Sequence, residues 1–135
     1  MKYKINLKTI GVVVIIGLIV FGLYAMLNPR GNEFGLPDEI YNHPNENVRE
    51  AYIFAVENPD VLEQVPCYCG CLNIGHESNK QCYFNEDGSI SDHGTLCGGC
   101  LGTTLDVKRM YNEGRSMEEI IEYVDVKYAP PVESG

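Results

Sequence analysis

The stretch that decides the fold of this 135-residue chain is residues 66–100, which read PCYCGCLNIGHESNKQCYFNEDGSISDHGTLCGGC. It holds all six cysteines of the protein and two of the three histidines. These eight side chains are Cys67, Cys69, Cys71, His76, Cys82, His93, Cys97 and Cys100. From residue 66 to 96 there is no sustained helical or strand period, and a loop of about thirty residues is rarely ordered by packing alone. The sequence therefore predicts that the cysteines hold this loop in place.

Helical patterns on both sides of the loop make the predicted fold class mainly α. Apolar residues at helical spacing predict a helix over 45–57, and Asn58-Pro59 ends it and begins a short helical turn. Asp87-Gly88 is a turn signal that could close a small hairpin inside the loop. Long alternating runs are missing from the sequence, so no sheet is expected.

Two more helices are predicted after the loop. The first covers 98–112 and ends near Gly114. By spacing, one face of this helix carries Leu101, Leu105, Lys108 and Tyr111. Ser116 followed by Glu119 is a capping-box pattern, and it opens the last helix.

The N-terminal segment predicts a membrane anchor. Residues 9–27 are uncharged and almost wholly apolar, and nineteen residues give roughly 28 Å of helix, close to the hydrocarbon thickness of a bilayer. A cleaved signal peptide or a buried core helix would be the alternatives, but the apolar run is long, no clean cleavage site follows it, and no polar face interrupts it. Three lysines precede the run and only Arg30 follows closely, so the C-terminal part is expected outside the cytoplasm.

These features predict four regions, all on a single-pass protein of the cell membrane. Residues 1–27 are the cytoplasmic lysines and transmembrane anchor, 28–44 a linker, 45–129 the small helical Cys/His domain, and 130–135 a tail. The membrane is the one expected partner, and an unidentified envelope protein is left open as a second.

The charge balance argues against nucleic acid as a partner. The whole chain has a formal net charge of −9, and the part after residue 27 has seven basic residues against all 19 acids, a formal charge of −12. Phosphate binding needs clustered Lys and Arg, which this chain lacks.

The hexapeptide Pro66-Cys-Tyr-Cys-Gly-Cys71 resembles the signature of the PCYCGC-motif (lipo)proteins, a bacterial and archaeal cell-envelope family. The similarity extends over about 48–128 and includes AYIFAVENPDVLEQV before the motif, GHESNKQC, SDHGTLCGGC and RMYNEGRSMEEIIEYVDVKY after it. Many members have a lipid-anchored cysteine where this chain has an apolar helix. The resemblance implies a location in the cell envelope and a cysteine pattern, and it implies no activity.

Three kinds of chemistry stay open for the eight candidate residues. The first is metal binding, either at one closed four-thiolate site or at two sites that share ligands. The protein would then capture or deliver copper or zinc. An iron–sulfur cluster is less favoured at an exposed surface. The second is a disulfide framework, which is usual outside the cytoplasm and would make the domain an envelope interaction module without metal. The third is thiol–disulfide exchange at Cys97-Gly-Gly-Cys100.

A shared site makes one geometric prediction: Cys97 and Cys100 should lie close to at least one of Cys67, Cys69 and Cys71. No nucleophile–base set, phosphate loop or paired-carboxylate pattern stands out in the sequence. An enzyme is therefore the less favoured interpretation.

Overall fold

In the computed structural model of the chain, the described residues are 7–27, 32–70 and 76–131. They fall into two units, Met1–Glu33 and Phe34–Gly135. The described part of the first unit contains helix α1 (Leu7–Leu27). The second contains α2 (Asp38–Tyr41), α3 (Glu46–Glu57), α4 (Pro59–Glu63), the 3₁₀ helix η2 (Asn79–Cys82), α5 (His93–Leu96), α6 (Gly98–Asn112) and α7 (Met117–Tyr128).

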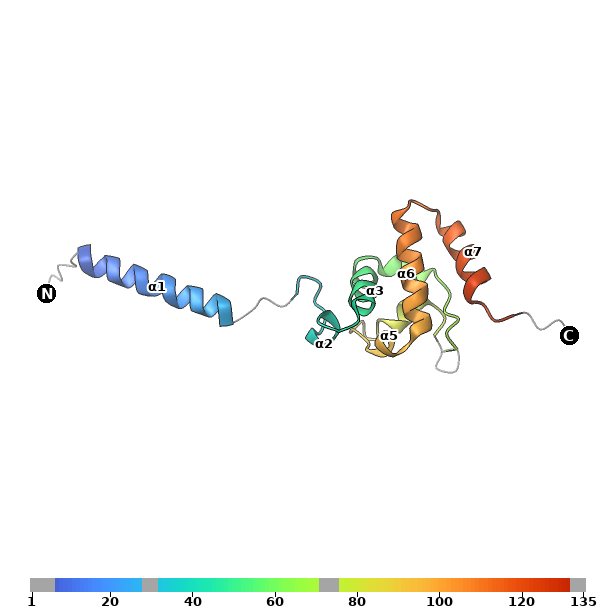
Figure 1. Ribbon diagram of the computed structural model, residues 1–135, viewed down its shortest axis with the longest axis horizontal. Coiled ribbons are helices and arrows are strands. Elements are labelled where there is room, and N and C mark those ends of the chain that lie inside the picture. Colours follow the sequence, from blue (N-terminus) through green and yellow to red (C-terminus); the bar gives the residue numbers. More distant parts are fainter. Residues whose placement is uncertain (1–6, 28–31, 71–75, 132–135) are drawn as a thin grey trace. The chain divides into compact units, whose positions relative to one another are not determined.

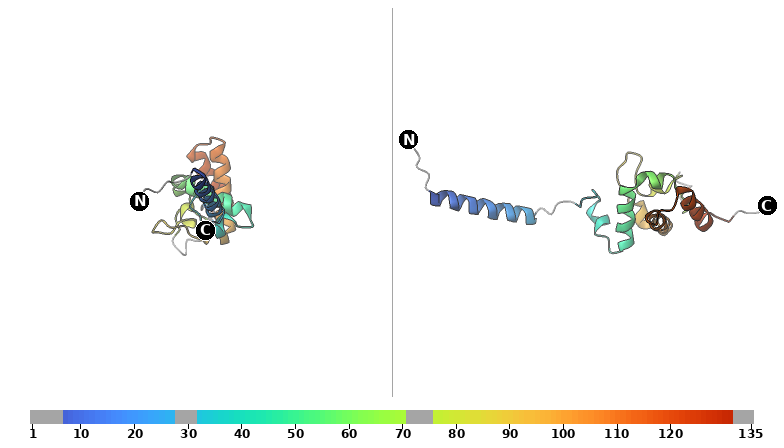
Figure 2. Two further views of the ribbon diagram at one scale, coloured as in Figure 1. Left: turned by 90° about the vertical axis from the view of Figure 1, so that its left-hand side faces the viewer. Right: turned by 90° about the horizontal axis from the view of Figure 1, so that it is seen from above.

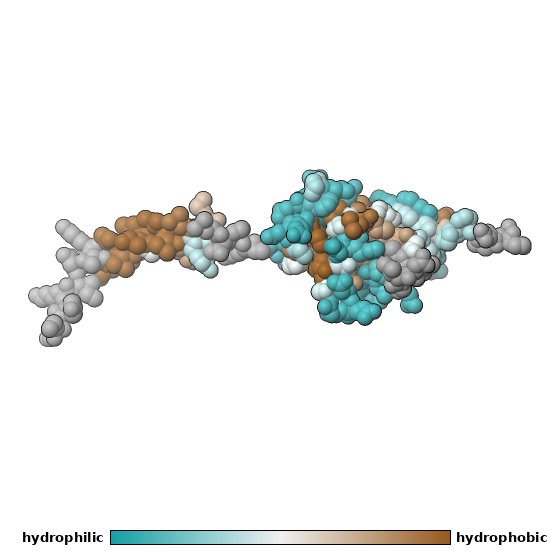
Figure 3. All heavy atoms as spheres, turned by 90° about the horizontal axis from the view of Figure 1, so that it is seen from below, coloured by the Kyte–Doolittle hydropathy of each residue, from teal (hydrophilic) through white to brown (hydrophobic). Residues whose placement is uncertain are grey.

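Helix α1 confirms the helix predicted over 9–27. Its apolar side chains are exposed all round, from Ile10 to Met26 wherever side chains are described, and Figure 3 shows the helix as an apolar rod. No helix among the described residues is both long enough and apolar enough to cross a membrane. The membrane-spanning role of this segment stays a prediction.

The helical domain is built around α6. Figures 1 and 2 show α6 between α3 and α7, and it packs against both of them. The core is formed by apolar residues from α2, α3, α4, α6 and α7 and from the segments next to them. Its largest fully buried side chains are Tyr52, Tyr83, Leu62, Ile120, Val48, Val65, Val107 and Val124. Among the described residues there are two isolated β-bridges and no sheet, which confirms the mainly helical fold class.

The helix ends follow the local signals of the sequence. Asn45 caps α3 by accepting a hydrogen bond from the Asn47 backbone N–H at 3.1 Å. Ser116 and Glu119 form the predicted capping box of α7. At the end of α6, Gly114 has a φ of +77°, and the N–H of Arg115 bonds the carbonyl of Met110 at 3.1 Å. This arrangement is a Schellman motif, so the predicted stop at Gly114 is confirmed.

The buried face of α6 lies beside the face that carries Leu101, Leu105, Lys108 and Tyr111. Leu101, Leu105 and Lys108 are only half-buried, and Tyr111 is 42% exposed. The buried residues of the helix are Cys100, Thr103, Thr104, Val107 and Met110. The helix turns Cys100 inward, toward the other cysteines, and residues three, four, seven and ten positions later must follow on the same side.

The segment 28–44, predicted as a linker, contributes to the domain from Phe34 onward. It contains the short helix α2, and Leu36 and Ile40 are 5% and 4% exposed. These two side chains are four residues apart, and both belong to the core. Apolar residues at that spacing can cover a core even in a Pro- and Gly-rich segment.

The predicted turn at Asp87-Gly88 is confirmed. Gly88 has a φ of +81°, and an antiparallel bridge pairs Phe84 with Ile90. The Asp87 carboxylate accepts hydrogen bonds from the Ser89 N–H and hydroxyl at 2.9 and 2.6 Å. This turn joins η2 to α5 and so connects two of the segments that carry cysteines.

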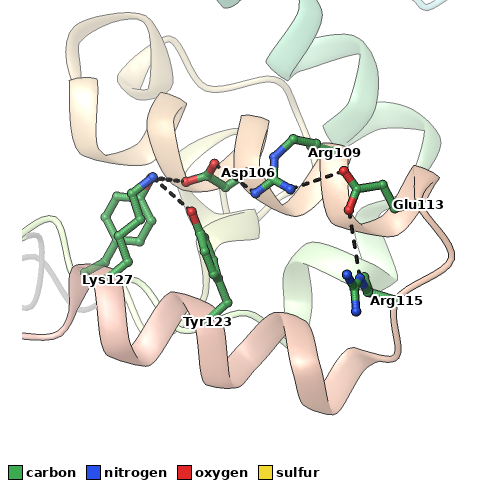
Figure 4. Close-up of polar contacts among 7 residues, drawn as sticks. Asp106, Arg109, Glu113, Arg115, Tyr123 and Lys127 are labelled. Carbon is green, nitrogen blue, oxygen red and sulfur yellow. Dashed lines mark hydrogen bonds and ion pairs between the residues drawn. The ribbon is translucent and has the colours of Figure 1, made fainter.

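Helices α6 and α7 are linked by a polar network around Asp106, drawn in Figure 4. Its carboxylate accepts hydrogen bonds from Lys127 Nζ and from the Tyr128 hydroxyl, each at 2.6 Å. Arg109 lies 3.6 Å from Asp106 and 3.3 Å from Glu113. Partial burial would raise the pKa of Asp106, but the hydrogen bonds from Lys127 and Tyr128 outweigh it and lower that pKa.

Replacing Asp106 with asparagine is expected to destabilise the domain by about 1 to 2 kcal/mol at neutral pH, because two charge-assisted hydrogen bonds are weakened. A carboxylate with a lowered pKa stabilises the fold above its unfolded-state pKa and loses that contribution as pH falls through its folded-state pKa. The difference in the free energy of unfolding between the unaltered protein and Asp106→Asn should therefore shrink below about pH 4. Urea denaturation at several pH values measures it, and a pH-independent difference would contradict this role.

Candidate metal centre

Four cysteine sulfurs meet in the interior of the domain. The Sγ atoms of Cys67, Cys69, Cys82 and Cys100 all lie within 4.8 Å of one another. The measured pairs are Cys82–Cys100 at 2.7 Å, Cys67–Cys69 at 3.0 Å, Cys69–Cys100 at 3.3 Å and Cys67–Cys82 at 3.7 Å. A tetrahedral centre with metal–sulfur bonds of about 2.3 Å places its sulfurs roughly 3.8 Å apart. The four side chains need only small outward movements to reach that geometry, and we call them the four-thiol group.

The four-thiol group is assembled from three segments of the chain. Cys67 and Cys69 follow α4, Cys82 ends η2, and Cys100 lies in the first turn of α6. Three of the thiols are buried, with Cys82 and Cys100 at 0% exposure and Cys67 at 3%, while Cys69 is partly buried. Buried thiols from three segments can be held together by one ion, which is how a metal orders a small domain.

Backbone pairing sets the first two segments against each other. The N–H of Asn79 bonds the carbonyl of Val65 at 2.8 Å, and the N–H of Cys67 bonds the carbonyl of Glu77 at 3.3 Å. Pro66 and Ser78 form an antiparallel bridge at the same place. These contacts bring the segment with Cys67 beside η2, where Cys82 lies.

A buried hydrogen-bond chain positions Cys100. The Tyr83 hydroxyl donates to the Cys100 carbonyl at 3.2 Å and lies 2.6 Å from the Thr104 hydroxyl, which donates to Asn79 Oδ1 at 2.6 Å. This chain ties the start of α6 to η2 directly behind the thiols. Sequence reasoning did not find Tyr83, Thr104 or Asn79, since nothing in their spacing marks them.

The start of α6 is shaped to let Cys69 come close. Cys97 is the N-cap of α6, and its Sγ accepts a hydrogen bond from the Cys100 N–H at 3.4 Å. A Cβ on Gly99 would lie 3.0 Å from Cys69 Cβ, whereas a Cβ on Gly98 would meet no atom of the described residues within 4 Å. The two glycines of the C-x-x-C motif therefore have different roles.

Gly99→Ala is expected to weaken metal binding, because the new methyl group pushes the Cys69 segment away from α6. We expect the loss of metal affinity to be about 10- to 100-fold, the range known for mutations in the shell that supports a metal ligand. Gly98→Ala is the matched control, since it makes the same chemical change one residue earlier without a contact. Competition with a chromophoric chelator measures both, and equal affinities for the two variants would contradict this role of Gly99.

A second group of ligands lies beside the first and shares one residue with it. His93, Cys97 and Cys100 each offer a ligand atom within 4.8 Å of the others. His93 and Cys97 are partly buried, while Cys100 is fully buried. The His76 ring packs edge-on against the His93 ring at 5.1 Å between centroids, and His76 Nδ1 lies 3.9 Å from Cys82 Sγ.

The thiols differ in their affinity for protons. Hydrogen bonds from Cys100 and Cys82 lower the pKa of Cys67. The hydrogen bonds that Cys100 makes with Cys67 and Cys82, together with burial, raise the pKa of Cys100. At Cys82 the contact with Cys100 lowers the pKa, but the contact with Cys67 and burial outweigh it and raise that pKa. Several thiolates cannot share this small volume unless a cation balances their charge.

The Cys97 thiol lies at the N-terminus of α6, where it is the N-cap. Burial would raise its pKa, but the backbone N–H of Cys100 and hydrogen bonds with the Cys100 and Cys69 side chains lower it overall. A lowered thiol pKa at a helix N-terminus is common to metal ligands and nucleophilic cysteines.

Seven of the eight candidate residues from the sequence lie in or beside these two groups. The sulfurs of Cys100 and Cys69 lie 3.3 Å apart, so the predicted closeness to the first cysteines is confirmed for Cys100. His76 belongs to neither group and lies next to Cys82. The eighth candidate, Cys71, falls in 71–75, outside the described residues.

Cys67, Cys82, Cys97 and Cys100 form no disulfide with another described residue. The shortest sulfur–sulfur separation, 2.7 Å between Cys82 and Cys100, is longer than the roughly 2.05 Å of a disulfide bond. The arrangement can therefore bind a soft cation through four thiolates, and its closest pair could be oxidised.

In a comparison with protein families, residues 33–133 match the family described as protein of unknown function with PCYCGC motif. No curated protein and no solved structure matches the chain. The matched region covers most of the chain and contains both ligand groups. This chain belongs to the PCYCGC-motif family of proteins of unknown function.

Proposed function

We propose that this protein binds a soft metal ion through the four-thiol group. The observation that carries the proposal is the meeting of four cysteine sulfurs within 4.8 Å, three of them buried. Sulfur donors select zinc, Cu(I) or iron over Mg²⁺ and Ca²⁺, and a closed set of four suits tetrahedral Zn²⁺ best. Zn²⁺ is therefore the first metal to test, and Cu(I) is the second.

Two features of the site favour a metal ion over a disulfide framework. The four-thiol group is not arranged as two separate pairs, since Cys69 and Cys82 each lie within 3.7 Å of two other cysteine sulfurs. His93 also joins Cys97 and Cys100, and it would have no role in a disulfide framework. We propose that the four-thiol group and the group of His93, Cys97 and Cys100 together serve metal capture or delivery.

Native mass spectrometry of the reduced full chain is the direct test of the proposal. With Zn²⁺ or Cu(I) added, the expected result is a stoichiometric metal adduct that protects cysteines from alkylation. Cys82→Ser removes a ligand that belongs to the four-thiol group alone, and it should abolish the tightest adduct. His43→Asn is the matched control, because His43 belongs to neither ligand group.

Oxidised cysteines without metal would overturn the proposal. In that case non-reducing digestion of the natively isolated chain would show the cysteines protected in linked peptides, and the disulfide framework would hold. If only Cys97 and Cys100 were reversibly oxidised to a disulfide, thiol–disulfide exchange would replace metal binding as the proposed function.

Metal affinity is expected to rise steeply with pH. The pKa values of Cys82 and Cys100 are raised in the metal-free chain, so both thiols must lose a proton when the metal binds. With at least these two protons released, the apparent dissociation constant should fall by about 100-fold or more per pH unit between about pH 6 and 8. Chelator competition across this range measures the slope, and a flat profile would show that the thiols are not the ligands.

We also propose that the segment containing α1 anchors the domain outside the cytoplasm. The uncharged run 9–27, the lysines before it and the exposed apolar surface of α1 support this placement. Fractionation of cells that make the full chain should find it in the membrane fraction. The double variant Ile15→Lys/Ile19→Lys should move it to the soluble fraction, and recovery of the unaltered chain there would refute the proposal.

A further inference from the structure

Cys100 belongs to both ligand groups. Its sulfur lies within 4.8 Å of the ligand atoms of Cys67, Cys69 and Cys82 and also within 4.8 Å of those of His93 and Cys97. A thiolate sulfur has more than one lone pair, so it can bind two metal ions at once or pass an ion from one side to the other. The two groups are thus adjacent positions with a common ligand.

The two positions differ in their access to solvent. Of the four-thiol group, only Cys69 is more than 3% exposed, whereas His93 and Cys97 are both partly exposed. Leu96, the residue before Cys97, is 84% exposed, so the α5–α6 junction lies at the surface. An ion that arrives from solution would meet His93 and Cys97 before it meets the buried thiols.

The ligand types fit an uptake role for the outer group. One imidazole and two sulfurs leave a fourth coordination position for water or a carrier ligand, and an open position is typical of sites that exchange ligands. The four-thiol group, by contrast, can fill all four positions of a tetrahedral ion with its own sulfurs. Beside the outer group His76 lines an open pocket of about 350 Å³, with Glu63, Lys80 and Ser91 among its other residues.

We propose that His93, Cys97 and Cys100 form an outer metal position that takes up a soft metal ion and hands it to the four-thiol group. The inference rests on the proposed function of that group. The Cys100–metal bond persists during the transfer, the bonds to His93 and Cys97 break, and bonds to Cys67, Cys69 and Cys82 form. The metal keeps its oxidation state, and the protons of the newly bound thiols go to solvent.

The test compares variants of the outer position with the unaltered protein in the reduced full chain. Native mass spectrometry under saturating Zn²⁺ should show two ions bound to the unaltered protein and one ion bound to Cys97→Ser and to His93→Asn. Stopped-flow transfer of Zn²⁺ from a chromophoric chelator should be slowed by about tenfold or more in both variants. Cys97→His keeps a ligand at the same place and should restore the second ion.

The possible failures can be told apart. If Cys97→Ser and His93→Asn matched the unaltered chain in stoichiometry and uptake rate, with one ion bound throughout, the outer position would be refuted and the four-thiol group would stand as the metal site. If the unaltered chain bound no ion at all, the proposed function would fail with it. Far-UV circular dichroism of each variant shows whether it is folded, and a folded Cys97→His that stays at one ion also counts against the outer position.

Discussion

Replacing Cys100 with serine is expected to weaken binding at both metal positions by more than about 100-fold, the largest effect of any single ligand change. Cys100 is the one residue common to the four-thiol group and to the group of His93 and Cys97. Losing an outer-shell partner costs about 10- to 100-fold in metal affinity, and losing a shared ligand should cost more at each position. The affinity of the variant for Zn²⁺, measured by chelator competition, should fall accordingly.

The helix itself should survive this change. Serine matches cysteine closely in size, and the Tyr83 hydroxyl bonds the backbone carbonyl of Cys100 rather than its side chain. Cys97→Ser serves as the control, because it removes a ligand from the outer position only. A Cys100→Ser protein that still bound one ion as tightly as the unaltered chain would show that Cys100 is not a ligand.

Gly94→Ala is expected to destabilise the domain by about 1 to 3 kcal/mol, the cost typical of overpacking a core. Gly94 is buried in α5, and a Cβ there would lie 2.8 Å from Tyr83 Cε1 and 3.0 Å from the Tyr52 hydroxyl. The two rings pack edge to face with centroids 4.8 Å apart. Neither can move aside freely, since Tyr52 donates to the Ser91 carbonyl at 2.7 Å and Tyr83 bonds Thr104.

Gly98→Ala is the matched control for this prediction. It lies four residues later, at the start of α6, where a Cβ would meet no described atom within 4 Å. Urea denaturation of the metal-free and metal-loaded proteins compares the two variants. Equal midpoints for Gly94→Ala and Gly98→Ala would mean that the contact with Tyr83 relaxes without cost.

The elements that could be predicted from the sequence are those with strong local signals. Asn45 before α3, Ser116 and Glu119 at α7, and Gly114 after α6 act within a few residues of chain, so their chemistry can be recognised directly. The turn at Gly88 has the same character. In each case the structure agrees with the prediction because distant residues have little influence there.

The buried face of α6 could not be predicted, because a tertiary contact decides it. The face of α6 with Leu101 and Leu105 is more apolar than the face with Thr103 and Thr104, yet the two threonines are buried and the two leucines are only half-buried. Cys100 has to face the thiols of Cys67 and Cys82, and this fixes the rotation of the whole helix. Thr104 becomes acceptable inside because Tyr83 and Asn79 satisfy its hydroxyl.

The location of the candidate site could be predicted from the sequence, but the assignment of its residues to two ligand groups could not. The density of cysteines in 66–100 and the nearby histidines marked the region. The spacing did not reveal that Cys100, rather than Cys97, completes the four-thiol group, because that choice depends on where α6 starts. The need for glycine at position 99 can be recognised only from the structure, which shows how closely Cys69 approaches it.

The convergence of three chain segments on the four-thiol group has a consequence for which part of the domain opens first. Helix α6 packs against α3 and α7 through the apolar core, whereas the segments of Cys67, Cys69 and Cys82 meet α6 at the thiols. Without a metal, no coordination bonds hold the thiols together, so this junction should reopen before the helices separate. A protease added to the metal-free chain should therefore cut first between η2 and α5, and metal should delay that cut.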